Sequence, residues 1–211
     1  RERQLCRMIV INRIDAEHAD LPELLEEIKQ TFGPECLPVN LPTGNATGTI
    51  NCFTQREGDS DLGAVADYHT AIIDQVVEVD DEVMSLYLEQ GDTLTPEQLH
   101  APFEQALREG HLVPICFTSA RTAEDVNAAV GVKDLLGVIE SLAPNPSEGN
   151  PRPFYRGEDK DEAFHTQPDP GAHLLAHVFA VRFDPFVGKL ALLRVHQGTM
   201  TPQSQVFIDD P

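Results

Sequence analysis

The sequence has few basic side chains. It carries 15 lysines and arginines against 35 aspartates and glutamates, so the formal charge of its 211 residues is −20. Nucleic-acid binding needs clustered basic residues that neutralise phosphates, so this balance argues against a direct nucleic-acid patch and against anionic membrane surfaces. No apolar run reaches the roughly 18 residues of a membrane span, and no basic start leads into a signal core. We therefore expect a soluble protein, and its 41% of hydrophobic residues is enough for a true core.

Cysteine is also scarce. The closest two of the four cysteines, Cys36 and Cys52, are 16 residues apart, so the paired spacing of a zinc site is absent. All four lie among apolar residues, which favours reduced thiols packed in strands and a cytoplasmic, reducing location. His173 and His177 could share one strand face, but no third ligand has a suitable spacing. We therefore expect no metal site.

Two motifs of catalytic chemistry are missing. The pattern GxxxxGK[ST], which cradles phosphates, does not occur, and neither does the GxSxG of many hydrolases. The chain also starts at Arg1 instead of a methionine and enters an apolar segment at once, so we interpret it as an excised part of a longer protein. We expect no catalytic residue for nucleotide hydrolysis in it.

The residues that are present favour an α/β fold of the doubly wound type. Apolar segments at 6–11 and 112–118 are typical of buried parallel strands, and amphipathic segments at 21–32 and 130–142 follow them as predicted helices. Between these two strand–loop–helix units we predict an insertion with strands at 36–41 and 49–53 and helices at about 62–88 and 96–109. Asp20 and Thr95 are the expected N-caps, and Gly33 and Gly110 the expected ends.

The pattern changes after the last of these helices. Residues 146–172 are rich in proline and charge and show no periodicity, so we predict an extended linker there. From residue 173 apolar and polar residues alternate, which indicates strands at 174–183, 189–196 and 205–208. These strands would open a second, β-rich domain.

Polar loops follow both apolar strands of the first part. In doubly wound sheets ligands bind at the carboxyl ends of the strands. The carboxylate of Asp15 can accept two parallel hydrogen bonds from the guanine edge, which adenine cannot offer. Asn12 can brace its loop and bond the base, and the flat stem of Arg13 can lie over the purine. The amide of Ala120 could donate to guanine O6 while Ser119 holds the turn. The plainer alternative is that residues 12–15 form only a polar turn before a helix.

A long acidic segment lies between the two loops. No lysine or arginine occurs from residue 57 to 107, against thirteen aspartates and glutamates. Such a run is usually a solvated face, but it also suits a docking surface for a basic partner.

These motifs resemble those of translational GTPases of the elongation factor G group. Asn12-Arg13-Ile14-Asp15 matches the Asn-Lys-x-Asp guanine motif, although Arg13 replaces the usual lysine, and Ser119-Ala120 matches the Ser-Ala motif. The gap between the motifs resembles the subdomain that this group inserts into its G domain. AHVFAVRFDPFVGKLALLRVHQGTM resembles the start of its β-barrel domain II. FGPECLPVNLP resembles the elongation factor G-like, second-type paralogues more closely.

The resemblance implies a division of the chain. Residues 1–145 would form the C-terminal part of a P-loop-type GTP-binding domain with its inserted α+β subdomain at about 36–110. A linker would occupy 146–172, and the first strands of a truncated barrel would occupy 173–211. The nucleotide-binding residues would be Asn12, Arg13, Asp15, Ser119, Ala120 and Arg121.

The resemblance also implies a function for the complete protein. It would bind GTP or GDP, with Mg²⁺ held by residues that this sequence lacks, and hydrolyse GTP on the ribosome in translocation or recycling. The acidic insertion would face a ribosomal stalk protein. Two alternatives stay open: a docking module without hydrolysis, and another translational GTPase such as a class II release factor or a ribosomal-protection protein.

Overall fold

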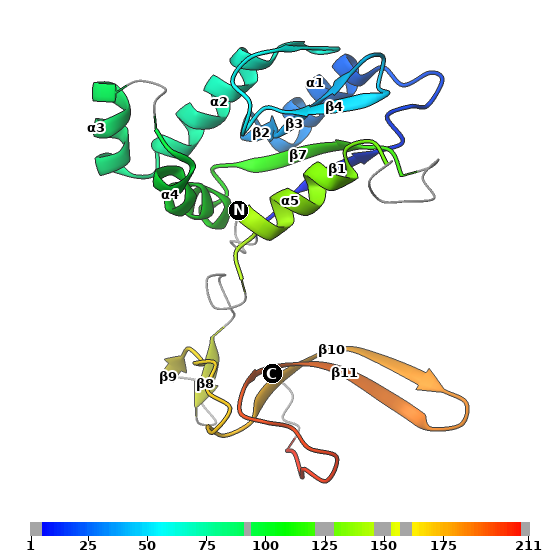
Figure 1. The fold of residues 1–211 in the computed structure, drawn as a ribbon. Helices are drawn as coiled ribbons and strands as arrows, with labels where there is room; N and C mark the ends of the chain where they lie inside the picture. The colour runs from blue at the N-terminus through cyan, green and yellow to red at the C-terminus, as the bar shows by residue number, and fades with distance from the viewer. Residues whose placement is uncertain (1–5, 91–93, 121–128, 146–152, 157–161, 208–211) are drawn as a thin grey trace. The chain divides into compact units, whose positions relative to one another are not determined.

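The computed structural model (Figure 1) describes residues 6–90, 94–120, 129–145, 153–156 and 162–207. Two compact units separate between residues 150 and 151. Unit 1 holds the parallel sheet and all five helices of the described residues, and unit 2 holds only strands. No helix of this part of the chain has the length and apolarity that crossing a membrane requires.

A three-stranded parallel sheet organises unit 1. Its order is β1 (Ile9–Asn12), β7 (Val113–Thr118) and β2 (Cys36–Pro38). β7 is buried along its whole length, whereas β1 lies at an edge and leaves Val10 46% exposed. The prediction of a fully buried first strand is therefore wrong, because among the described residues only β7 pairs with β1.

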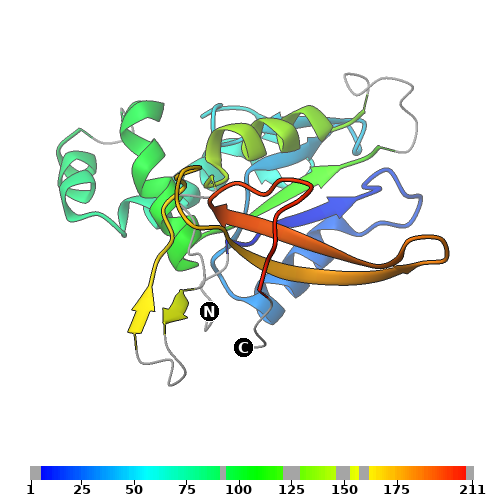
Figure 2. The same ribbon diagram turned by 90° about the horizontal axis from the view of Figure 1, so that it is seen from below.

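Helices cover both faces of this sheet, as Figures 1 and 2 show. α1 (Leu21–Phe32) packs its apolar stripe against Val113, Ile115 and Phe117 of β7. The alternate residue Cys116 faces the other cluster, which contains Val138 of α5 (Val132–Leu142). This alternation places helices on both faces of a parallel sheet, so the predicted mixed α/β fold is confirmed.

Both ends of two helices follow from local signals. Asp20 caps α1 by accepting from the amide of Glu23, and Gly33 ends the helix. α4 (Pro96–Glu109) begins with a capping box at Thr95 and ends at Gly110, whose φ of 77° is left-handed. These boundaries agree with the sequence predictions.

The predicted helix at 62–88 is wrong, because it is two helices. α2 (Val65–Val77) ends before a short turn, and α3 (Asp81–Gln90) begins after it. The carboxylate of Asp80 accepts from the amides of Glu82 and Val83 and so caps α3. Two small antiparallel pairs complete this region: β3 (Asn40–Thr43) with β4 (Gly48–Asn51), and β5 (Asp59–Ser60) with β6 (Gly63–Ala64).

The predicted strand at 36–41 is also divided. β2 pairs with β7 in the parallel sheet, and after Val39 the chain turns into β3, which pairs with β4 instead. The amide of Val39 still donates to the carbonyl of Ile115 at 2.9 Å. The same short segment therefore belongs to two sheets.

Unit 2 is an antiparallel hairpin of β10 (Leu175–Asp184) and β11 (Gly188–Gln197). β8 (Phe154–Arg156) and β9 (Glu162–Phe164) form a second small pair inside the predicted linker, where Phe154 and Phe164 lie with ring centroids 6.1 Å apart. Residues 205–207 are not in a strand, since the described residues offer them no strand partner, so this prediction is wrong for that range. Residue 208 lies outside the described residues.

Candidate guanine site

The two candidate loops meet at the carboxyl edge of the sheet. β1 and β7 run parallel with Asn12 opposite Thr118, so both strands end at the same level. The amide of Ile14 donates to the carbonyl of Thr118 at 3.2 Å, which joins the loop after β1 to the end of β7. The fold thus brings residues 107 positions apart to one site, at the edge where such sheets bind ligands.

Asn12 connects the two loops. Its Oδ1 accepts from the amide of Arg13 at 2.9 Å, from the Thr118 hydroxyl at 3.4 Å and from the amide of Ala120 at 3.4 Å. Asn12 thus braces its own loop, as expected, and its side chain also reaches across to the second loop. The contact to Ala120 is near the outer limit of hydrogen-bond length, so this amide is held only weakly.

Asp15 and Ser119 are direct neighbours. The hydroxyl of Ser119 donates to Oδ1 of Asp15 at 2.5 Å. Ser119 is 2% exposed, and its own amide donates to the carbonyl of Val130. Ser119 therefore does more than hold its turn: it orients the carboxylate that is expected to read the base.

Arg13 lies between Asn12 and Asp15 in a left-handed conformation, with φ of 62°. Few residues other than glycine adopt this region, and the bond from its amide to the Asn12 side chain stabilises the turn. The Arg13 side chain is exposed, so its stem is accessible to a purine ring. Arg121, the sixth predicted residue, lies outside the described residues.

Asn40 supports this site, although no sequence motif points to it. Its buried side-chain amide bonds both backbone groups of Phe117, two residues before Ser119. Asn40 is separated from Phe117 by 77 positions, so no local pattern could have identified it. The one available signal was a polar residue inside an apolar strand segment.

Metal-ligating side chains are not clustered in the described part of the chain. Among the described residues no group of three or more histidine, cysteine, aspartate or glutamate side chains is placed to hold a metal ion. Asp134 and Gly137 have an Asp-x-x-Gly spacing, but both lie within α5, and the Asp134 carboxylate accepts from Asn40 and Thr49. The residues present fit the base of a nucleotide, and we assign them no step at the phosphates.

The histidines are engaged elsewhere. Nδ1 of His177 lies 3.1 Å from Nε2 of His196, and His177 stacks on Phe154 with ring centroids 4.3 Å apart. His177 thus pairs with His196 across the hairpin, and His173 contributes its carbonyl to Gln197.

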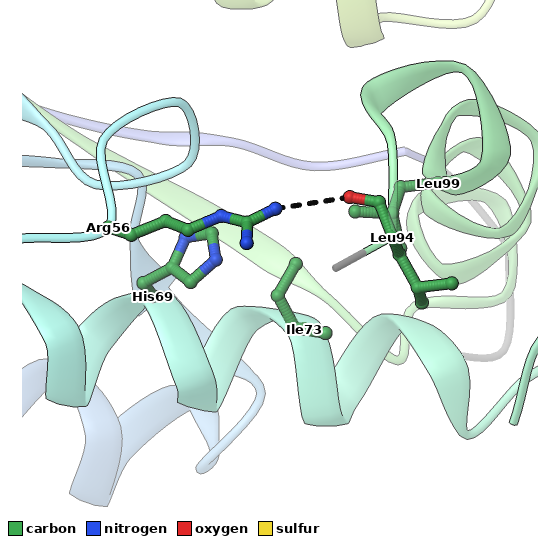
Figure 3. A pocket seen from close by; sticks show the side chains of 5 residues that line it. All are labelled: Arg56, His69, Ile73, Leu94 and Leu99. Atoms are coloured by element: carbon green, nitrogen blue, oxygen red, sulfur yellow. Dashed lines mark hydrogen bonds between the residues drawn. The ribbon is translucent and has the colours of Figure 1, made fainter. Parts of the chain in front are cut away.

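Figure 3 shows a small hollow in unit 1 beside Arg56 and His69. Nη2 of Arg56 donates to the carbonyl of Leu94 there at 3.2 Å. The hollow is lined also by Ile73 and Leu99, and its volume of about 10 Å³ suits one water molecule. Nδ1 of His69 contacts the carbonyl of Cys52 at 2.8 Å. A hollow of this volume is too small for a nucleotide.

Burial governs the thiols. The pKa values of Cys52 and Cys116 are raised to about 12, chiefly because burial penalises the thiolate. Cys36 is buried in β2, whereas Cys6 is exposed and precedes β1, so the expectation of a packed thiol is wrong for Cys6. All four are free.

Comparison with known proteins gives this site a context. The chain is 28% identical to elongation factor G of Fervidobacterium nodosum and 25% identical to that of Salinibacter ruber. Each alignment covers 95% of this chain and 30% of the relative. A crystal structure from Thermus thermophilus superimposes with a TM-score of 0.65 at 28% identity, covering 96% of this chain and 29% of that one. No protein-family model matches.

These similarities establish a distant relationship to elongation factor G over nearly the whole chain. The chain spans about 30% of the length of the relatives it matches. Its parallel sheet and small antiparallel hairpins are consistent with part of such a GTPase.

Proposed function

We propose that this chain is the guanine-reading part of the GTP-binding domain of a translational GTPase related to elongation factor G. In the complete protein, cytoplasmic GTP binding and hydrolysis would drive translocation or recycling of ribosomes. The observation that carries the proposal is the meeting of Asn12, Asp15, Ser119 and Ala120 at one sheet edge. The similarity to the second-type paralogues makes that subgroup our preferred assignment.

Each residue has a role that its contacts permit. Asp15, oriented by the Ser119 hydroxyl, would accept from N1–H and the 2-amino group of guanine. The weakly held amide of Ala120 would turn from Asn12 to O6 of the base. Adenine presents neither pattern, and each mismatched group that the bound base covers would cost about 1–3 kcal/mol.

The chain would contact the base of the nucleotide but not its phosphates, and this limits its affinity and activity. Most nucleotide affinity in such proteins comes from phosphate contacts, which these residues do not supply. We expect at best millimolar guanosine binding and no GTP hydrolysis above background. Turnover by the purified chain would contradict this assignment.

The experiment that tests the base assignment is Asp15→Asn. An amide at position 15 can donate to the C2 carbonyl of xanthine while it accepts from N1–H. Guanosine binding should therefore weaken about tenfold, and xanthosine should become the preferred nucleoside. Binding of both nucleosides is measured by NMR titration of the purified chain.

Asp20→Asn is the matched control for this experiment. It makes the same chemical change at an exposed N-cap, where asparagine serves equally well. We expect wild-type guanosine binding in this variant. Equal guanosine affinity in wild type and Asp15→Asn would remove Asp15 from the site.

A second candidate function rests on the acidic helices. We propose that α2 and α3 form a docking face toward a ribosomal stalk protein, since the exposed acidic residues Asp67, Asp81, Glu82 and Glu89 have no basic residue near them in sequence. A docking module without hydrolysis would keep this face and lose the guanine preference. Asp81→Lys with Glu82→Lys should weaken stalk binding in a salt-dependent way while leaving nucleoside binding intact.

A further inference from the structure

A buried side chain extends the central sheet where a strand is missing. β2 pairs with β7 only as far as Pro38 and Ile115. Beyond that point the Asn40 side chain takes the place of a strand: its Oδ1 accepts from the amide of Phe117 at 2.7 Å, and its Nδ2 donates to the carbonyl of Phe117 at 3.0 Å. Both Asn40 and Phe117 are fully buried. Without this amide, two buried backbone groups would lack a partner, which is costly.

The same side chain meets two other elements. Nδ2 of Asn40 also lies 3.2 Å from Oδ2 of Asp134, in the first turn of α5. That oxygen accepts from the hydroxyl of Thr49 in β4 at 2.7 Å. One amide and one carboxylate therefore join β3, β4, β7 and α5.

The packing around this junction leaves little room for adjustment. Gly131, just before α5, has φ of 66°, and a Cβ there would stand 2.1 Å from the carbonyl oxygen of Phe117. The adjacent Val130 accepts from the amide of Ser119 at 2.9 Å. The position of α5 relative to Phe117 is thus fixed on one side by Asn40 and Asp134 and on the other by backbone contact.

The junction leads directly to the candidate site. Phe117 is followed by Thr118, whose hydroxyl bonds Asn12, and by Ser119, whose hydroxyl bonds Asp15. A change in the anchoring of Phe117 would move the groups that orient the carboxylate and present the amide of Ala120. Asn40 itself lies at the start of β3, away from these groups in sequence.

We propose that Asn40, with Asp134 and Thr49, positions the end of β7 for base recognition and couples the β3–β4 pair to the nucleotide site. This role rests on the proposed function for its ligand, but the anchoring itself does not depend on a nucleotide. Asn40 is a positioning residue that acts through Phe117. Asparagine suits the task because the site needs one donor and one acceptor at fixed separation, which aspartate and leucine do not provide.

The first test measures anchoring without ligand. Asn40→Asp keeps the shape, loses the donor to Phe117 and places a second carboxylate beside Asp134. We expect hydrogen exchange of the Ser119 amide to become about tenfold faster, while the exchange of Ile28 in α1 changes little. General destabilisation would instead accelerate both amides alike. Asn51→Asp, in the strand position opposite Asn40, is the control, because its Oδ1 keeps accepting from Phe53 and Thr54.

The second test adds guanosine and follows its dissociation constant by NMR. We expect about fivefold weaker binding in Asn40→Asp, wild-type binding in Asn51→Asp, and partial recovery when Asp134→Asn relieves the repulsion in the double variant. Unchanged Ser119 exchange and unchanged affinity in Asn40→Asp would overturn the positioning role while the guanine site stands. A wild type without preference for guanosine over adenosine would overturn the proposed function, and the exchange result would still decide the anchoring.

A milder variant keeps the test decisive where Asn40→Asp does not fold. Thr49→Val removes only the hydroxyl that donates to Asp134, at a half-buried position. We expect the Ser119 amide to exchange about twofold faster and guanosine to bind about twofold more weakly. Wild-type exchange at Ser119 in that variant would then overturn the proposal.

Discussion

The two units bury their apolar side chains to very different degrees. In unit 1, β7 is buried from end to end and packs against helices on both faces. In unit 2, none of the described residues is buried, and the hairpin leaves Phe179, Phe183 and Phe186 largely exposed. Both units have strands, but among the described residues only the strands of unit 1 are covered by a second layer. An apolar pattern therefore predicts a strand, whereas burial depends on the layers around it.

The largest expected effect tests this contrast with one substitution in each unit. Phe103 in α4 is 0% exposed and lies edge-on to Phe53, with ring centroids 4.9 Å apart. Phe103→Ala should lower the free energy of unfolding by about 3–5 kcal/mol, because it removes a large ring from a closed core. Phe183→Ala, at 76% exposure, should change it by less than about 0.5 kcal/mol. Urea unfolding followed by circular dichroism measures both, and equal effects would erase the contrast.

Alkaline pH offers a second test of the unit 1 core. The pKa values of Cys52 and Cys116 are about 12 in the folded chain and near the ordinary 9.0 when unfolded. Both thiols are protonated in both states below pH 9, so their stabilising contribution is complete there and is lost as pH rises from 9 toward 12. The free energy of unfolding should fall by about 1 kcal/mol per pH unit for each thiol.

The measurement is urea unfolding at pH 8, 9 and 10. The variant carrying both Cys52→Ala and Cys116→Ala should show a shallower decline than the wild type. Parallel declines in the two proteins would mean that these thiols ionise in the folded core.

Unit 2 should respond to acid instead. The pKa of His196 lies below its ordinary 6.5 because of partial burial first, and then because of the nearby His177 and Arg194 charges. The folded hairpin thus disfavours the proton, so the contribution of His196 to stability is present above pH 6.5 and is lost as pH falls through the lowered value. NMR titration of the ring protons measures the pKa of His196.

His177→Gln provides the matching variant. It removes the neighbouring imidazole and its charge, so the pKa of His196 should move upward toward its ordinary value. An unchanged His196 titration would show that burial alone sets its pKa.

The smallest effect concerns surface chemistry. Cys6 is exposed, whereas Cys36, Cys52 and Cys116 are buried. A thiol-alkylating reagent at neutral pH should therefore label the native chain once, at Cys6, and label all four cysteines in urea. Mass spectrometry counts the labelled cysteines in the native chain and in urea. Labelling of Cys116 in the native chain would show an open core.

Local signals predicted part of this structure well. Asp20 with Gly33, and Thr95 with Gly110, set both ends of α1 and α4. The break between α2 and α3 cannot be read from the apolar stripe, because the stripe continues across it. The carboxylate of Asp80, which caps α3 at this break, accepts from only two amides. A single N-cap residue is a weaker indication of a helix boundary than a continuous apolar stripe is of one uninterrupted helix.

Long-range contacts account for the other differences. The split of the segment at 36–41 depends on Asn40 bonding to Phe117, 77 positions away, and no local pattern contains that information. The motif residues Asn12, Asp15, Ser119 and Ala120 could be found in the sequence because each follows an apolar strand. Their meeting required the parallel pairing of β1 with β7, which the doubly wound pattern already favours.

The central claim is that these four residues read guanine, and a titration of the ¹⁵N-labelled chain tests it most directly. Guanosine and adenosine are added in turn at millimolar concentration while the amide signals are followed. The account predicts saturable shifts of the Ile14, Asp15, Ser119 and Ala120 amides with guanosine and none with adenosine. Equal shifts with both nucleosides, or shifts confined to other residues, would contradict it.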